Sequence, residues 1–199
     1  MPAAMEAVIR LASAGDAAAI AAIYRPFVEK THISFEEQAP DSAEMARRIA
    51  GVRPGFYPWM VAEAGGRILG FGGSSAYRAR PAYRWTVETA IYVEPAAHGR
   101  GLGRVLLTQL LSILEQQGFV AAIGAIALPN DPSVALHEKL GFVHTATYRG
   151  VGFKLGRWID VGRWQRDLAP RVVHPSEPLP YAEVRHPSLE PGSAFSSTE

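Results

Sequence analysis

Residues 84 to 128 read as a strand, a glycine-rich loop, a long helix and a second strand in direct succession. Over residues 102 to 114 leucines recur every four positions, which is the spacing of one apolar helix face. Gly118 is a suitable residue to end that helix. The run 119–128 is almost continuously apolar, as a strand covered on both faces would be. A helix packed on a buried sheet restricts the fold to the mixed classes.

Two helices are predicted before the first strand. Asp16 is placed to cap the first of them, and Pro26 should kink or split it. Asp41 followed by Glu44 resembles a capping box for a second, short helix that ends near Gly51. The sheet is therefore expected to begin after these helices.

The remaining elements follow from turn residues and β-rich segments. Gly65-Gly66 suits a tight hairpin, because both glycines accept a positive φ. Asp131 and Pro132 supply an N-cap and a first-turn proline for a short helix that ends at Gly141. The resulting order predicts an α+β, or mixed α/β, domain with one sheet. The predicted strands are 59–64, 67–77, 84–93, 119–128, 142–149 and 157–168.

We assign residues 1–170 to one domain. A chain of 199 residues with 48% hydrophobic content can bury a single continuous core. After Pro170 the chain has five prolines and scattered polar residues without periodicity. Residues 171–199 are therefore expected to form a flexible tail.

Composition excludes several classes of function. The 20 basic and 19 acidic residues give a net charge of +1 without a long run of one sign, so we expect no nucleic-acid partner. The absence of cysteine excludes disulfides, thiolate metal sites and an acyl group held on a protein thiol. No bound metal is expected. No segment offers the roughly 18 uninterrupted apolar residues of a membrane span, so a cytoplasmic protein without a membrane partner is expected.

The sequence from His98 to Gly103 (HGRGLG) opens the long helix. Its glycines let the backbone approach a ligand, and the unpaired amides at a helix start attract anions. Arg104 stands where a Walker loop needs lysine, and the third glycine of a dinucleotide fingerprint is missing. The loop therefore predicts a pyrophosphate cradle with Arg100 and Arg104 at its rim. A turn that only connects strand to helix is the alternative.

These segments resemble the GNAT (GCN5-related) acetyltransferase superfamily, whose coenzyme loop reads Gln/Arg-x-x-Gly-x-Gly/Ala. His98 stands at the first position of that loop, and His137 stands where the family often has tyrosine. The similarity is closest to the branch that acetylates phosphinothricin and methionine sulfoximine. It implies a central, mostly antiparallel sheet flanked by helices, acetyl-CoA as cosubstrate and a homodimer. The matching segments, which lie within residues 8 to 168, are 57–59, 80–83, 85–88, 128–133, 136–138 and 160–167.

Two residues are candidates for catalysis. Alternation along the strand 84–93 places Glu88 and Tyr92 on one face, with the small Ala90 between them. A solvent-facing glutamate fits the pattern equally well, but the resemblance assigns the catalytic base to Glu88. The resemblance also brings His137 close to the thioester, where it can protonate the leaving thiolate or order a water. A packing role is the alternative for this histidine.

Other residues are assigned to binding. Guanidinium groups suit carboxylate or phosphinate oxygens, and aromatic rings suit an apolar wall, although a solvated basic hairpin is the alternative. The predicted substrate contacts are Phe35, Arg78, Arg80, Tyr83 and Tyr92. The predicted coenzyme contacts are Ile91, Tyr92, Val93, His98, Gly99, Arg100, Gly101, Leu102, Gly103, Arg104, Asn130 and Ser133.

The function expected from the sequence is direct transfer of an acetyl group from acetyl-CoA to the amine of a small amino-acid analogue. Phosphinothricin and the sulfoximine or sulfone of methionine represent this substrate class. Acetylation of another small amine or of a peptide N-terminus is one alternative. A protein that binds acyl-CoA without catalysis is another.

Overall fold

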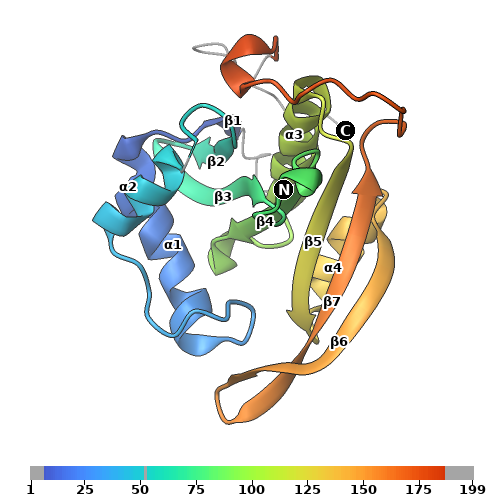
Figure 1. Cartoon of the computed structure of the whole chain (residues 1–199). Coiled ribbons are helices and arrows are strands. Elements are labelled where there is room, and N and C mark those ends of the chain that lie inside the picture. The colour runs from blue at the N-terminus through green and yellow to red at the C-terminus, as the bar shows by residue number, and fades with distance from the viewer. Residues whose placement is uncertain (1–6, 52, 187–199) are drawn as a thin grey trace.

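The described residues form one seven-stranded sheet (Figure 1). The computed structural model describes residues 7–51 and 53–186. All neighbouring strands are antiparallel except β4 and β5, which are parallel, so the α+β class with a mostly antiparallel sheet is confirmed. From edge to edge the strands are β1 (Val8–Leu11), β2 (Trp59–Ala64), β3 (Arg67–Ala76), β4 (Thr86–Val93), β5 (Ala121–Leu128), β7 (Arg157–Asp167) and β6 (Val143–Lys154).

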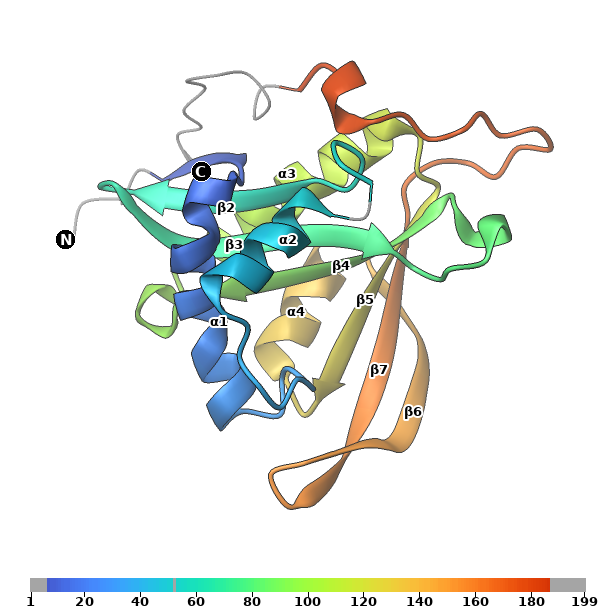
Figure 2. The same cartoon turned by 60° about the vertical axis from the view of Figure 1, so that its left-hand side comes forward.

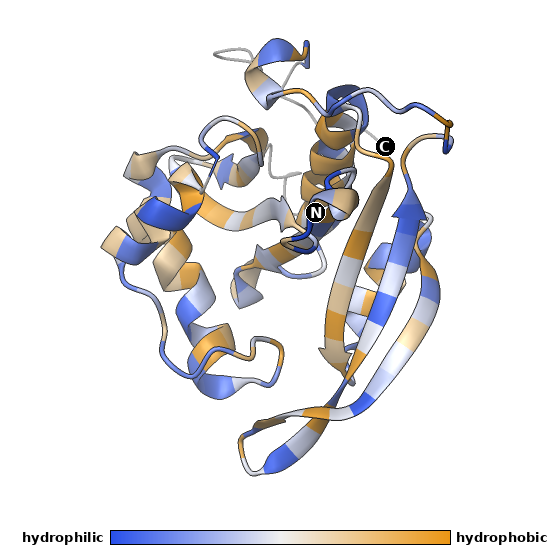
Figure 3. Cartoon of the chain, viewed as in Figure 1, coloured by the Kyte–Doolittle hydropathy of each residue, from blue (hydrophilic) through white to orange (hydrophobic). Residues whose placement is uncertain are grey.

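Helices cover both faces of this sheet. Alternation along the strands gives each face its own apolar core: Val61 and Phe71 are buried against α1 and α2, whereas Val87 and Ala122 are buried against α3. Figure 3 shows that α3 and β5 are mostly apolar, whereas β7 is mostly hydrophilic. The helices are α1 (Ala17–Lys30), α2 (Ser42–Ala50), α3 (Leu102–Gln117) and α4 (Asp131–Lys139).

Three of the predicted turn and cap positions act as expected, whereas Asp16 stands at the N-cap of α1 without a side-chain cap hydrogen bond, because its carboxylate accepts from Arg10 and from the Ser13 amide. Gly65 and Gly66 have φ values of 57° and 73° and connect β2 to β3, a conformation that other residues adopt only with strain. The Asp41 carboxylate accepts a hydrogen bond from the Glu44 amide at 2.8 Å, which caps α2. Gly118, with φ of 90°, ends α3. Local sequence therefore determines these boundaries.

The N-terminal part differs from the prediction in two ways. A strand, β1, precedes α1 and pairs with β2, and the Arg10 guanidinium fixes it to Asp16 and Glu63 at 2.8 Å each. Four residues are too few for an alternating pattern to stand out. Pro26 does not split α1, which continues to Lys30 because its buried side chains pack on the sheet.

The start of α4 and the end of β6 also differ from the prediction. Asn130, not Asp131, is the N-cap of α4, because its side chain accepts from the Ser133 amide. Strand β6 continues beyond the predicted end to Lys154. The buried ammonium of Lys154 donates to the carbonyls of Val28 and Ser34 at 2.6 Å each, and thereby ties β6 to the last turn of α1 and to the segment after it.

The segment after β7 runs past the end of α3 (Figure 1). The Trp85 indole donates to the Ser176 carbonyl at 2.8 Å, and the buried Gln117 amide donates to the Leu179 carbonyl at 2.6 Å. Tyr181 and Val184 pack against the α3 core. These contacts were not predicted. Residues 187–199, the rest of the predicted tail, lie outside the described part, so a flexible tail over 171–199 stays a prediction.

Strands β4 and β5 separate towards their carboxyl ends, which creates the position of the site (Figure 2). They pair only from Thr86 with Ala121 to Thr89 with Gly124. Beyond that point each strand keeps its outer neighbour, and the inner edges move apart. In the part of the chain that the structure describes, no helix combines the length and apolar character needed to cross a bilayer.

Candidate active site

A cavity of about 770 Å³ lies where β4 and β5 part. Its walls are the second half of β4, the glycine loop with the start of α3, the end of β5, and α4. All predicted coenzyme contacts line it except Arg100. An elongated ligand can therefore extend from the start of α3 to the point where the two strands meet.

The glycine loop gives one end of the cavity its anion-binding character. Gly99 and Gly101 have φ values of 75° and 77°, and helix α3 begins directly after them at Leu102. The first hydrogen bond of that helix runs from the Val105 amide to the Gly101 carbonyl at 3.1 Å, so the preceding amides have no helical acceptor. Such amides and the helix dipole favour phosphate groups. This end of the cavity therefore fits a pyrophosphate.

His98 has a structural role in this loop. Its Nε2 atom lies 2.8 Å from the carbonyl oxygen of Val93, the last residue of β4. A carbonyl only accepts, so Nε2 carries the proton in this contact. His98 thus ties the loop to the end of the strand.

His137 occupies the other end of the cavity, where the strands meet. It is buried, and its ring lies against Gly124, where a Cβ atom would come within 2.7 Å of Nε2. Nδ1 lies 2.8 Å from the Ser133 carbonyl, so Nδ1 donates and Nε2 carries the lone pair in the neutral ring. Burial lowers the pKa of this imidazole, against an opposing effect of the Ser133 hydrogen bond. At neutral pH, His137 therefore presents an acceptor.

Glu88 lies on the other face of the sheet, beside the closed end of the cavity. Its side chain is partly exposed, and its Oε2 accepts from Arg163 Nη1 at 2.9 Å. Arg163, for which no role was predicted, comes from β7, two strands away from β4. This pair orients the carboxylate. Pairing of this kind across three strands has no signal in a single sequence.

Tyr92 shares a sheet face with Glu88, as predicted, and it lines the cavity. Its ring contacts those of Tyr24, Phe27 and Phe71 at centroid distances of 4.8, 5.2 and 5.3 Å. Burial raises the pKa of its phenol well above the ordinary value, so the ring stays neutral. It forms part of the apolar wall on the α1 side.

The other predicted substrate contacts do not line the cavity. Arg78, Arg80 and Tyr83 lie on the exposed loop between β3 and β4, at the opposite end of β4 from the glycine loop. The Tyr83 ring packs edge-on against Tyr77 at 5.7 Å. Phe35 is 43% exposed, and its ring covers Gly152 of β6. Glu88 lies between the cavity and the arginine loop along β4.

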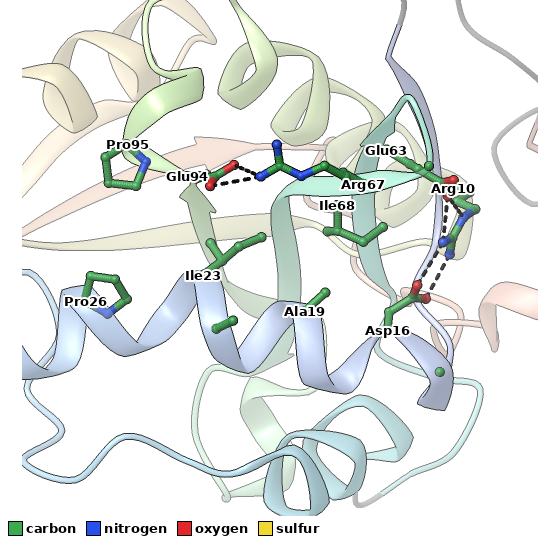
Figure 4. Close-up of a pocket in the computed structure, with 13 residues that line it drawn as sticks. Arg10, Asp16, Ala19, Ile23, Pro26, Glu63, Arg67, Ile68, Glu94 and Pro95 are labelled. Atoms are coloured by element: carbon green, nitrogen blue, oxygen red, sulfur yellow. Dashed lines mark hydrogen bonds and ion pairs between the residues drawn. The ribbon is translucent and has the colours of Figure 1, made fainter.

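A second cavity of about 590 Å³ lies between α1 and the β2–β3 hairpin (Figure 4). Its charged side chains pair with one another: Arg10 bridges Asp16 and Glu63, and Arg67 lies 3.4 Å from Glu94. Arg10 lowers the pKa of the Asp16 carboxyl to about 2, against the effect of burial. Since these charges are neutralised within the wall, this cavity does not fit a polyphosphate.

This fold, with its parallel strand pair that opens beside a glycine loop and a helix start, is shared with acetyltransferases whose structures were solved with acetyl-CoA. A family model described as an acetyltransferase (GNAT) domain matches residues 9–162. The chain belongs to this GNAT acetyltransferase family, and it is an N-acetyltransferase of the phosphinothricin acetyltransferase-like type.

The chain is similar to several characterised relatives. It is 41% identical over 171 residues to the phosphinothricin N-acetyltransferase of Streptomyces viridochromogenes, covering 84% of this chain and 93% of that one. It is 35% identical to the L-methionine sulfoximine/L-methionine sulfone acetyltransferase of Salmonella typhimurium, covering 80% and 94%. A phosphinothricin acetyltransferase from Sinorhizobium meliloti, solved with acetyl-CoA, superposes with a TM-score of 0.84 at 37% identity, covering 90% and 98%.

The glycine loop provides a direct test of the coenzyme site. Gly101→Asp should weaken acetyl-CoA binding by about 100-fold or more, because it adds a carboxylate beside the phosphates and an unfavourable positive φ. Gly101→Ala introduces the backbone strain without the charge and should cost about tenfold or less. Isothermal calorimetry measures both, with circular dichroism as the check of folding. Wild-type affinity in a folded Gly101→Asp protein would contradict the assignment.

Proposed function

We propose that this chain transfers the acetyl group of acetyl-CoA directly to the α-amino group of a small amino-acid analogue, with Glu88 as general base. Phosphinothricin and the sulfoximine or sulfone of methionine are the proposed substrate class. The observation that supports this best is that Glu88 directly precedes Thr89, the last paired residue of β4 and part of the cavity wall, and lies on the opposite face of the strand. Relatives named for these substrates support the class.

The distribution of polar and apolar groups along the cavity matches that of acetyl-CoA. The start of α3 is suited to the pyrophosphate, and the apolar walls between the strands are suited to an extended arm. After Thr89 the inner edge of β4 no longer pairs with β5, so backbone groups of residues 90–93 on that edge can bond a ligand. When bound, the coenzyme supplies an activated acetyl thioester. The same backbone amides are the proposed donors to its carbonyl oxygen.

Glu88 is assigned to the amine proton. An amino acid arrives mainly as an ammonium ion near neutral pH, and it must lose a proton before its nitrogen can form a bond. Arg163 engages Oε2 of Glu88, so the second oxygen, Oε1, is the proposed proton acceptor. The proton moves directly or through one water.

His137 is assigned to holding a hydrogen bond rather than to donating a proton. Its Nδ1–H donates a hydrogen bond to the Ser133 carbonyl, and burial lowers the pKa of the ring and so favours its neutral form. Its Nε2 atom can therefore accept from a water or a hydroxyl group in the cavity. This geometry supports the ordering role over the acid role.

Glu88→Gln tests the base. The amide can still bond Arg163 but cannot accept a proton, so kcat should fall by about 100-fold or more while the Kd for acetyl-CoA stays within about twofold. Steady-state kinetics with release of free thiol and calorimetry measure the two quantities. Glu63→Gln, which removes the charge of a partly exposed glutamate on β2, is the matched control. Unchanged turnover in Glu88→Gln would exclude this residue as the base.

We propose the loop from Arg78 to Tyr83 as the anion-binding part of the substrate site. From one end of β4 to the other, the order is the glycine loop, the cavity, Glu88 and then the loop from Arg78 to Tyr83. A substrate whose amine lies at Glu88 can therefore extend its remaining groups towards the two arginines. Arg78 and Arg80 are exposed and offer guanidinium groups for a carboxylate or phosphinate. Tyr83, 41% exposed, supplies a ring beside them.

A substrate panel on Arg80→Ala tests this loop. Losing a charge-assisted hydrogen bond should lower kcat/KM for phosphinothricin and the methionine sulfone by about 10- to 100-fold. The amide or ester of the same amino acid lacks one anion and should lose less. Equal losses for charged and neutral substrates would mean that Arg80 supports the fold or the coenzyme instead.

We further propose that the chain forms a homodimer through the β6 edge. Strand β6 ends the sheet and leaves its outer backbone groups unpaired within the described chain. Its hairpin with β7 exposes Val143, Tyr148, Val151, Phe153, Leu155 and Trp158, each at least 46% accessible. An apolar edge strand of this kind is suited to a second copy.

Light scattering after size-exclusion chromatography tests the dimer. The wild-type protein should elute with about twice the 21.5 kDa chain mass. Trp158→Glu should shift it to the monomer, because a buried unpaired charge weakens an interface by several kcal/mol. Val173→Glu changes an apolar residue that is 88% exposed elsewhere and is the matched control. A dimer that survives Trp158→Glu together with Phe153→Glu would rule out this edge.

A further inference from the structure

Thr89 has a buried hydroxyl group without a hydrogen-bond partner. Its side chain is 4% exposed, and Oγ1 contacts no protein donor or acceptor. An unpaired buried hydroxyl lowers stability, so it is rare and requires an explanation. Thr89 also lines the cavity between β4 and β5. A ligand in this cavity can supply the missing partner.

The position of Thr89 coincides with the closed end of the cavity. Thr89 and Gly124 are the last paired residues of β4 and β5, and the His137 ring lies over Gly124. Residues in register on neighbouring strands direct their side chains to the same face. The Thr89 hydroxyl and the His137 ring therefore share the α3 and α4 side of the sheet at this point.

Glu88 and Thr89 are consecutive, so their side chains lie on opposite faces of β4. The amine that Glu88 deprotonates approaches from the α1 and α2 side. A thioester held in the gap between β4 and β5 can place its sulfur on the other side, which is where Thr89 and His137 lie. With the pyrophosphate at the start of α3, the coenzyme arm runs along the gap and ends at Thr89.

Between these two side chains, Thr89 is the one with a proton to donate. Neutral His137 presents a lone pair on Nε2, because its Nδ1 proton is held by Ser133. The Thr89 hydroxyl is a donor with no acceptor inside the protein. A sulfur atom that gains negative charge is the acceptor that this arrangement suits.

We propose that Thr89 is a catalytic residue whose hydroxyl donates a hydrogen bond to the coenzyme sulfur as the thiolate leaves. As the amine nitrogen bonds to the acetyl carbon, the carbon–sulfur bond breaks and its electron pair stays on sulfur. Glu88 takes the amine proton, and the Thr89 proton stays on its oxygen while it stabilises the sulfur anion. The sulfur later gains a proton from solvent. This proposal rests on the coenzyme and base assignments above.

The pKa of the thiol in bound coenzyme A tests this contact without turnover. The chain has no cysteine, so thiolate absorbance in the complex comes from coenzyme A alone once a blank with S-methyl coenzyme A removes the tyrosine signal. Wild-type protein should hold this pKa below that of the free coenzyme. Thr89→Val should raise it by about one unit, which corresponds to a tenfold change in the ionisation equilibrium.

The free protein supplies a second readout of opposite sign. Valine has nearly the same shape as threonine and removes the unpaired hydroxyl, so Thr89→Val should fold and raise Tm by roughly 2–4 °C. If Thr89 only packed against its neighbours, Thr89→Val would not be expected to raise both the Tm of the free protein and the pKa of the bound thiol. In addition, kcat should fall about tenfold.

Two variants complete the experiment. Thr89→Ser keeps the hydroxyl and should restore the thiol pKa, whereas Thr86→Val makes the same change three residues earlier on the Glu88 face and should leave it unchanged. A thiol pKa that does not respond to Thr89→Val, or that shifts equally in Thr89→Ser, would overturn the proposal. The titration needs no amine, so it is independent of the amino-acid substrate class and of Glu88. A folded wild-type protein that binds no coenzyme A would overturn both proposals.

Discussion

The structure depends on the limited pairing between β4 and β5. The parallel ladder ends at Thr89 and Gly124, although β4 continues to Val93 and β5 to Leu128. Backbone groups beyond that point would be left unpaired inside the protein, at a cost that a bound ligand can offset. Beyond that point β4 keeps its pairing with β3, and β5 keeps its pairing with β7. The gap is thus a consequence of the fold, and the chemistry is arranged around its closed end.

A glycine at this end of the gap makes space for a histidine side chain. Gly124 leaves room for the His137 ring, since any Cβ there would overlap the imidazole. The Ser133 carbonyl, one helical turn earlier in α4, then sets which ring nitrogen carries the proton. On β4 the alternation of side chains places a carboxylate and a hydroxyl on opposite faces at consecutive positions. Under the proposals above, two adjacent residues therefore act on the attacking amine and on the leaving thiolate of one reaction.

The sequence predicted the elements whose signals are local and strong. Helix α3, the Gly65-Gly66 turn, the α2 cap and the two faces of β4 follow from periodicity and turn chemistry alone. Strand β1 was missed because four residues show no period, and the Asn130 cap was missed because Asp131-Pro132 gives an equally good pattern. The Arg163 pair with Glu88 joins residues 75 positions apart, so only the folded sheet reveals it. Most of the cavity lining could be predicted from the sequence, whereas the Arg163 partner of Glu88 could not.

Burial of His137 links the protonation state of the site to the stability of the fold. The folded pKa lies below the unfolded value of 6.5, so as pH falls through 6.5 the unfolded chain binds a proton that the folded chain does not. Unfolding is favoured in that window, and stability from this group is greatest above it. Asp16 acts in the same direction at lower pH, because its carboxyl has a pKa of about 2 in the fold against 3.8 unfolded. Its contribution is complete above 3.8 and disappears as pH falls through 2. The burial that makes His137 an acceptor at neutral pH therefore also makes the folded protein less stable in acid.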